Sequence, residues 1–433
     1  MRVLSRAVTR PRWVAPYSPT IVAALVIAGA AVALAAPATA APLRLAEAID
    51  IALRDNPLIA GAGDRARAMQ EVPAQVSAYD DPTLSWEAWD IPDSLRVDQA
   101  ENNIFRLSQK LPFPGKRTLA GTRATREADA AAEDVQTVRL EVRAAVTRAY
   151  AELWLASESA RVVERDRALF ERLAHTAESQ YAIGQTTQAD VLRAEVELTH
   201  AVIAQRTAAL AIEAARAELN ALLSRTPDAP LGEPQAPAVR RIEPPLETLI
   251  ERALGTRPEL AAQRAMIGRE TSGVELAQLG TWPDFEVSVG RFINFDRNDG
   301  FGAMASVTLP FVQIGKYRAA VGEARARVAG AESALRRLQD EVRRDVAVAY
   351  ARANTAALEH QLARTTHVPH AEQAVRASEA AYVSGAADFS GLLDALRMVQ
   401  ETHLQHVDAA AAYLRAVADL ERAVGGPLDA IEE

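Results

Sequence analysis

Alternating apolar and polar residues predict four β-strands, arranged as two pairs far apart in the chain. The first pair lies in residues 83–111 and the second in residues 284–309. In the third strand, Phe285, Val287 and Val289 are separated by polar residues, so one face is apolar and the other is polar. Each run is about 8–10 residues long, close to the 9–11 residues of a tilted membrane strand. A half-buried sheet in a soluble exported protein would give the same alternation.

After each strand pair, the spacing of apolar residues changes to that of a helix. This change predicts long helices at about residues 115–224 and 316–424. Residues 115–226 contain no proline, and apolar residues recur there at spacings of three and four, which is the seam of a coiled coil. A helix over residues 115–180 would be roughly 100 Å long and would need partner helices along its whole length. The seam residues are Val135, Val138, Val142, Ala145 and Ala149 in the first stretch and Leu335, Leu338, Val342, Val346 and Ala349 in the second.

The two stretches are copies of one another. The string Leu-Pro-Phe at residues 111–113 returns at 309–311, and the pattern Tyr-x-x-Gly that ends at Gly184 returns at Gly385. A period of about 200 residues is far longer than a solenoid repeat, so it marks two large structural halves. We therefore predict repeats at residues 41–226 and 246–427, joined by a proline-rich linker at 227–245 in which no regular element survives.

Composition narrows the class of protein. The 433 residues carry a net charge of -9, which argues against nucleic acid as a partner because nucleic-acid-binding proteins normally present a basic face. The absence of cysteine excludes disulfides, thiolate metal sites and a lipid-modified cysteine.

The first 40 residues predict a cleaved signal peptide. Four arginines precede the apolar run Ile21–Ala36, and Ala38-Thr39-Ala40 is a small-residue cleavage site. The run is shorter than the roughly 20 residues of a membrane-spanning helix. The mature chain is therefore exported. If its four strands lie in a membrane, several chains must share one barrel, because four strands cannot close and open edges cannot face lipid.

These features resemble the TolC family of outer membrane efflux channels over the whole mature chain. The turn motifs at residues 181–194 and 382–395 are similar to that family's helix tips. The strings LPFPGK at 111–116 and VPHAEQA at 368–374 resemble its heavy-metal branch, the CzcC-like and CusC-like channels. The resemblance implies a mainly α fold with membrane β-structure: a homotrimer whose long helices form an α-barrel in the periplasm, with four strands per chain in a shared 12-stranded β-barrel.

The same resemblance implies a function and partners. The chain would be the outer membrane channel of a tripartite efflux system, a passive exit duct without cofactors, embedded in outer membrane lipid and extending into the periplasm. A periplasmic adaptor protein and an inner-membrane RND-type pump would deliver the cargo, expected to be heavy-metal cations. A multidrug or type I secretion channel is the alternative within the family, and an exported coiled-coil structural protein is the alternative of a different class.

The resemblance also implies functional residues at the tips. Asp394, with Asp190, is expected at the channel aperture, where acidic side chains would attract cations. The structural alternative for both carboxylates is stabilisation of a helix start. The residues expected to contact the adaptor are Tyr181, Gly184, Tyr382, Gly385 and Asp388.

Other candidate chemistry is weaker. The pairs His367/His370 and His403/His406 have the i,i+3 spacing that puts two imidazoles on one helical face. Pro369 interrupts the first pair and neither pair brings an evident third ligand, so we predict no metal site. The chain contains no G-x-S-x-G, H-E-x-x-H or Walker A motif, and we predict no enzyme activity.

Overall fold

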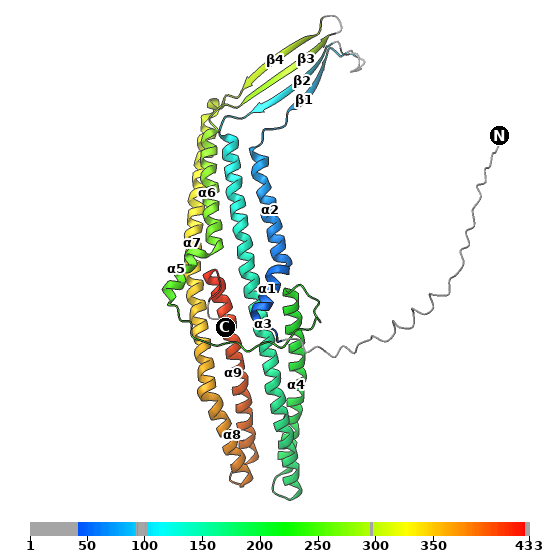
Figure 1. Ribbon diagram of the computed structural model, residues 1–433, viewed down its shortest axis with the longest axis vertical. Helices are drawn as coiled ribbons and strands as arrows, with labels where there is room; N and C mark the ends of the chain where they lie inside the picture. The colour runs from blue at the N-terminus through cyan, green and yellow to red at the C-terminus, as the bar shows by residue number, and fades with distance from the viewer. Residues whose placement is uncertain (1–41, 92, 94–99, 101, 295–297, 429–433) are drawn as a thin grey trace, which may run out of the picture. The chain divides into compact units, whose positions relative to one another are not determined.

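The computed structural model describes residues 42–428, apart from residues 92, 94–99, 101 and 295–297. The predicted signal peptide lies outside these residues. Two short helices, two strands and two long helical segments follow one another, and the same order then repeats (Figure 1). The first copy contains α1 (Leu45–Asp55), α2 (Pro57–Ser77), β1 (Thr83–Trp89), β2 (Asn102–Leu111), α3 (Lys116–Ala182) and α4 (Gln188–Leu222). The second contains α5 (Leu246–Thr256), α6 (Pro258–Leu279), β3 (Phe285–Asn294), β4 (Gly300–Val307), α7 (Ile314–Leu362), α8 (Val368–Val383) and α9 (Phe389–Val424).

The two copies differ in their long descending helix. In the first copy α3 is one continuous helix of 67 residues. In the second copy a π-helical turn, Ala363–His367, separates α7 from α8, and Pro369 lies in the first turn of α8. Proline has no backbone N–H to donate, and it lies here directly after the irregular turn that interrupts the regular helical hydrogen bonding. A short 3-10 turn, Pro310–Gln313, precedes α7.

The four predicted strands form one antiparallel sheet in the order β1-β2-β3-β4. The register aligns Leu84 with Leu107, Leu107 with Val289 and Val289 with Ala303, so these residues form one row across the sheet. This apolar face is open: Leu84 is 72% exposed and Val289 is 60% exposed. Within the described residues β1 and β4 each have only one neighbouring strand.

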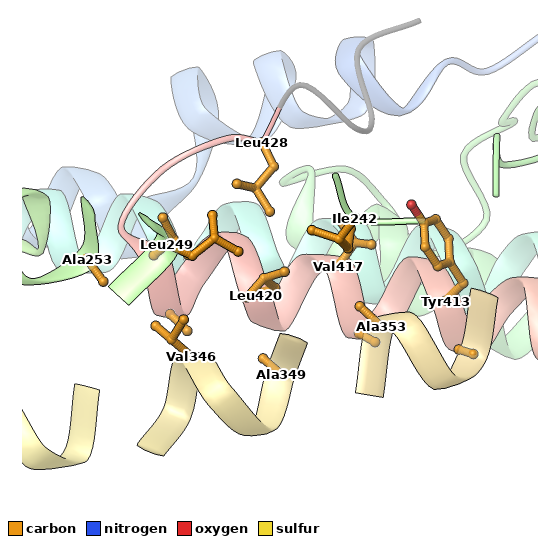
Figure 2. Close-up of a cluster of buried hydrophobic side chains, with 14 of the residues drawn as sticks. Ile242, Leu249, Ala253, Val346, Ala349, Ala353, Tyr413, Val417, Leu420 and Leu428 are labelled. Atoms are coloured by element: carbon orange, nitrogen blue, oxygen red, sulfur yellow. The ribbon is translucent and has the colours of Figure 1, made fainter. Parts of the chain in front are cut away.

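Buried apolar residues, alanines among them, hold the helices together. Figure 2 shows Val346 and Ala349 of α7 facing Val417 and Leu420 of α9, with Leu249 of α5 beside them. Alternate spacings of three and four residues bring this stripe of α7 to one face, as the sequence predicts. Ten labelled members of the cluster come from α5, α7, α9 and the segments that flank them.

The first long helix is buried more widely than its predicted seam. In α3, Val146 and Tyr150 are buried as well as Val142 and Ala149, whereas Ala145 is only half-buried. The reason is the number of neighbours, since α3 packs against α1, α2, α4, α6 and α9. A helix with neighbours on several sides is covered beyond a narrow coiled-coil stripe.

The proline-rich segment between the two copies is anchored to α3. Residues 227–245 contain no helix and no strand. Their only β-type backbone pairing is an isolated parallel bridge between Leu43 and Pro234. The hydroxyl of Tyr150 accepts a hydrogen bond from the Gln235 amide at 2.8 Å and lies 2.9 Å from the Leu43 carbonyl oxygen. One buried side chain therefore ties the start of the first copy and the linker to the same helix. Among the described residues, no helix is long and apolar enough to cross a membrane.

Candidate functional site at the helix tips

Two helical hairpins end in tight turns at the end of the helical region opposite the sheet (Figure 1). Gly184 has φ +74° and Gly385 has φ +72°, a left-handed conformation that glycine adopts without steric cost. The residue after each glycine donates back across the turn, from Gln185 N to Gln180 O at 2.9 Å and from Ala386 N to Ala381 O at 2.8 Å. Both turns are thus Schellman caps, which satisfy the last carbonyl groups of α3 and α8.

The two predicted tip tyrosines have different surroundings. Tyr382 packs edge-on against Phe389, with ring centroids 5.9 Å apart, and joins the apolar cluster of the tips. Tyr181 is exposed. Position 188 of the first copy, which corresponds to Phe389, is a glutamine, so the aromatic partner is missing there. The second tip is therefore the better-packed one, and the first tip leaves an aromatic ring accessible.

The ascending helices begin with caps of two kinds. At α4, Thr187 and Asp190 form a capping box in which the Asp190 N–H donates to Thr187 Oγ1 at 3.3 Å and the Asp190 carboxylate accepts from the Thr187 N–H at 3.3 Å. At α9, Asp388 is the N-cap and its carboxylate accepts from the Gly391 N–H at 3.0 Å. Each cap satisfies amide groups that the helix itself leaves free.

The two carboxylates predicted at the aperture differ in how freely they meet solvent. The side chain of Asp190 is 17% exposed and also accepts from the hydroxyls of Thr187 and Thr186, at 2.7 and 3.0 Å. These hydrogen bonds, that of Thr187 first, lower the pKa of Asp190. The side chain of Asp394 is 76% exposed, and its closest cation is Arg397, 3.8 Å away on the next turn of α9. Of these two carboxylates, that of Asp394 is therefore the one that lies mostly in solvent.

Polar contacts join the two hairpins near their tips. Arg193 of α4 donates from Nη1 to Ser390 Oγ of α9 at 2.9 Å. Arg397 of α9 forms an ion pair and hydrogen bond with Glu197 of α4. This contact raises the pKa of the Arg397 guanidinium. These residues and Asp394 line a groove of about 550 Å³ between α4 and α9.

An apolar cluster lies beside these polar contacts. Phe170 and Leu173 of α3 and Leu392 and Leu396 of α9 are buried in it, so the two hairpins share one core at this level. Sequence patterns alone did not predict the contacts of Arg193, Glu197 and Arg397. A signal was available for one of them, because Arg193 occupies the repeat position of Asp394 and carries the opposite charge.

The histidines pair across helices rather than along them. His406 of α9 stacks on His360 of α7 with ring centroids 4.6 Å apart, and His403 lies 3.4 Å from the Glu372 carboxylate of α8. Burial, followed by the neighbouring positive groups, lowers the pKa of both His360 and His406. Within the part of the chain that the structure describes, no three histidine, aspartate or glutamate side chains are grouped so as to hold a metal ion.

The described strands form one sheet with an exposed apolar face, and long paired helices continue it, which is the architecture of a channel subunit. The family comparison agrees. The chain belongs to the outer membrane efflux protein family, whose model matches residues 48–225 and 249–426, once in each half. It is an outer membrane efflux channel protein that extends into the periplasm.

Three known proteins illustrate the similarity. The cobalt-zinc-cadmium resistance protein CzcC of Cupriavidus metallidurans is 23% identical over 383 residues, which cover 88% of this chain and 90% of the relative. The fusaric acid resistance protein FusA of Burkholderia cepacia is 29% identical over 265 residues, which cover 55% of this chain and 47% of FusA. The crystal structure of CusC has a similar fold, with a TM-score of 0.75 at 15% identity, covering 90% of this chain and 94% of CusC.

Proposed function

We propose that three copies of this chain form the exit duct of a tripartite efflux system. The observation that carries the proposal is the sheet: four strands with an exposed apolar face and one open edge each at β1 and β4. Unpaired strand edges are unstable in lipid, because each free N–H and C=O group lacks a hydrogen-bond partner there. Pairing β4 of one copy with β1 of the next removes every edge, and three copies give 12 strands.

The helices support the same assembly. On α4, Leu192, Val196, Ile203 and Leu210 are exposed although they recur at heptad spacing. On α7 a second exposed stripe contains Val348, Leu358 and Leu362, also at coiled-coil spacing. Apolar stripes of this kind are stable when another helix covers them. Neighbouring copies in a ring supply that cover.

The tips then close the periplasmic end of the duct and contact the adaptor. The two turns, with their Schellman caps, give the adaptor a rigid surface. The residues of this surface are Tyr181, Gly184, Tyr382, Gly385 and Asp388. Asp394 is the aperture carboxylate in this proposal, since its side chain is free to face a pore. We assign Asp190 chiefly to the start of α4, which its hydrogen bonds with Thr187 support.

The mechanism is passive. An inner-membrane RND-type pump supplies the energy, the adaptor opens the tips, and cargo diffuses through a water-filled tube. The relative CzcC supports heavy-metal cations as the cargo, because its name assigns it to cobalt, zinc and cadmium resistance. The relative FusA, a fusaric acid resistance protein, supports an organic molecule as the second candidate. Secreted polypeptide is a third cargo class, for which no feature described above argues.

Two measurements test the proposed duct, and a third tests its cargo. Purified protein in detergent should sediment as a trimer and should produce discrete conductance steps in a planar lipid bilayer. A stable monomer that never perforates a bilayer would refute the duct. For the cargo, deletion of the gene should sensitise cells to zinc, cobalt or cadmium. Sensitisation to organic compounds alone would assign the cargo to the second candidate.

A further inference from the structure

Four side chains fasten the two halves of the chain together where the strands meet the helices. Phe113 stacks on Trp282 with ring centroids 4.8 Å apart and planes inclined by 25°. The Lys116 ammonium donates to Asp284 Oδ1 at 2.7 Å and to the Trp282 carbonyl at 3.0 Å. The Phe113 N–H donates to the same carboxylate oxygen at 2.8 Å. We call Phe113, Lys116, Trp282 and Asp284 the junction clasp; it joins the start of α3 in the first half to the start of β3 in the second.

Phe113 and Lys116, the clasp residues at the start of α3, have counterparts before and at the start of α7. Phe311 ends the second Leu-Pro-Phe string, and Lys316 follows a glycine as Lys116 does. Phe311 is 66% exposed, whereas Phe113 is half-buried against its partner ring. Lys316 is exposed, and its ammonium lies 5.4 Å from the ring of the adjacent Tyr317. The second copy therefore presents an aromatic ring and a cation that the first copy uses for a contact between halves.

The strand side of the clasp has a counterpart of similar chemistry that is displaced along the chain. Trp282 and Asp284 correspond in the repeat to Asp81 and Thr83, where β1 begins, so neither side chain is itself repeated. Exposed carboxylates lie just before β1 at Asp80 and Asp81, and an exposed ring lies at Tyr79, with the Arg117 guanidinium of the same chain over the ring at 3.3 Å from its centroid. Within one chain these residues follow α2 at one edge of the sheet, and Phe311 follows β4 at the other edge.

The flank of α7 supports the idea that a neighbour is missing. Gly121 and Ala128 are buried in α3, which packs against both α2 and α6. Their repeat positions on α7, Val321 and Val328, are only half-buried, although valine is the larger and more apolar residue. A second copy that brings its own α2 against α7 would bury them, as α2 and α6 together bury α3.

We propose that Phe311 and Lys316 of one copy form an intersubunit clasp with the segment Tyr79–Asp81 of the next copy. The proposal rests on the trimer proposed above and adds the residues that fasten its subunits. Phe311 packs against Tyr79 of the partner subunit, and Lys316 pairs with Asp80 or Asp81 of the partner subunit. The occupant is a second copy because the chain already makes a contact of the same chemistry, an aromatic pair beside a lysine–aspartate pair, at the corresponding junction between its own halves, and the charges are complementary.

Cysteine cross-linking tests the contact directly, since the chain has no cysteine of its own. The pair Phe311→Cys/Tyr79→Cys should give a covalent trimer on oxidation, seen as a threefold increase in mass on a denaturing gel. The control pair Phe113→Cys/Trp282→Cys should cross-link within one chain and leave the mass unchanged. Each single-cysteine variant should remain uncross-linked at this junction. A trimer by sedimentation without the intersubunit cross-link refutes the clasp alone, while a monomer refutes the proposed duct as well.

Charge reversal provides a second test that needs no oxidation. Lys316→Glu should speed dissociation of the detergent-solubilised trimer by about fivefold, the equivalent of one exposed ion pair. Adding Asp80→Lys/Asp81→Lys should restore slow dissociation. If Phe311 and Lys316 instead contact phospholipid headgroups, Lys316→Glu weakens binding to anionic vesicles, and the reversed acidic residues restore nothing. That result would overturn the proposal.

Discussion

Removal of the Arg397 guanidinium should loosen the helix tips. Arg397 of α9 pairs with Glu197 of α4, and the two residues lie on different hairpins of the chain. The Glu197 side chain is 10% exposed and that of Arg397 is 53% exposed, so the pair lies between the buried and surface extremes. In Arg397→Met the apolar stem stays, but a nearly buried carboxylate loses its cation. We expect a loss of about 1–3 kcal/mol in local stability, between the values for exposed and buried pairs.

Amide hydrogen exchange is the appropriate assay, because it reports the free energy of local opening. At about 1.4 kcal/mol per factor of ten, exchange of the tip amides of α4 and α9 should accelerate by about 5- to 150-fold. Amides near the sheet should not change. The matched control is Arg376→Met, since Arg376 pairs with Glu372 at 4.0 Å on the exposed surface of a single helix. It should alter exchange by less than about twofold.

A double-mutant cycle separates the pair from the residues themselves. Glu197→Gln removes the carboxylate charge, so adding Arg397→Met to it should cause little further loss. Strict additivity of the two substitutions, or tip exchange in Arg397→Met equal to that of the unmodified chain, would show that the contact contributes nothing to closure. The same variants in a planar bilayer indicate whether a looser tip conducts better.

Three further substitutions probe the aperture, the histidine pair and the turns. Asp394→Ala should leave the trimer intact and raise single-channel conductance, and an unchanged conductance would remove Asp394 from the aperture. Burial lowers the pKa of His360 and His406 in the native state, so the unfolded state binds more protons at acidic pH. The free energy of unfolding should therefore fall as the pH drops below about 6.5. His406→Gln should reduce this pH dependence, as measured by thermal unfolding. Gly385→Ala should cost about 1–2 kcal/mol in thermal unfolding because φ is +72°, although nothing lies within 4 Å of the added Cβ. The control Gly330→Ala, inside α7 and equally unobstructed, should stabilise by about 0.5–1 kcal/mol.

The elements of the fold could be predicted because each has a local signature. A strand with one lipid-facing side must alternate, as Phe285, Val287 and Val289 do, and a helix in a coiled coil must repeat apolar residues at spacings of three and four. The internal duplication made each signature visible twice. The left-handed turns could be predicted for the same reason, since glycine after Tyr-x-x at both helix ends points to one backbone conformation.

The contacts between elements could not be predicted in the same way. Spacing along a helix indicates that His403 and His406 share a face, but not which helix covers that face. In the structure they face different groups, Glu372 and His360, on the two helical segments separated by the π-helical turn. The pairing of Arg397 with Glu197 likewise joins residues 200 positions apart. Such contacts depend on how hairpins lie against each other, which periodicity does not encode.

The two copies carry different charged residues at their helix tips. At the tips, Asp190 is committed to a capping box, while the cap of α9 comes from Asp388 and its third position is Gly391. Three residues further along each helix, the repeat position carries Arg193 in the first copy and Asp394 in the second.

In the proposed ring of three chains these two positions would alternate, giving three cations and three anions around the aperture. Alternating charges attract neighbours, whereas a purely acidic ring would repel itself in a narrow pore. The Arg193 guanidinium already donates to Ser390 on the facing helix, which shows that it reaches across the hairpins. In the proposed ring this charge pattern would favour closure by attraction, and opening would require a partner that separates the two signs.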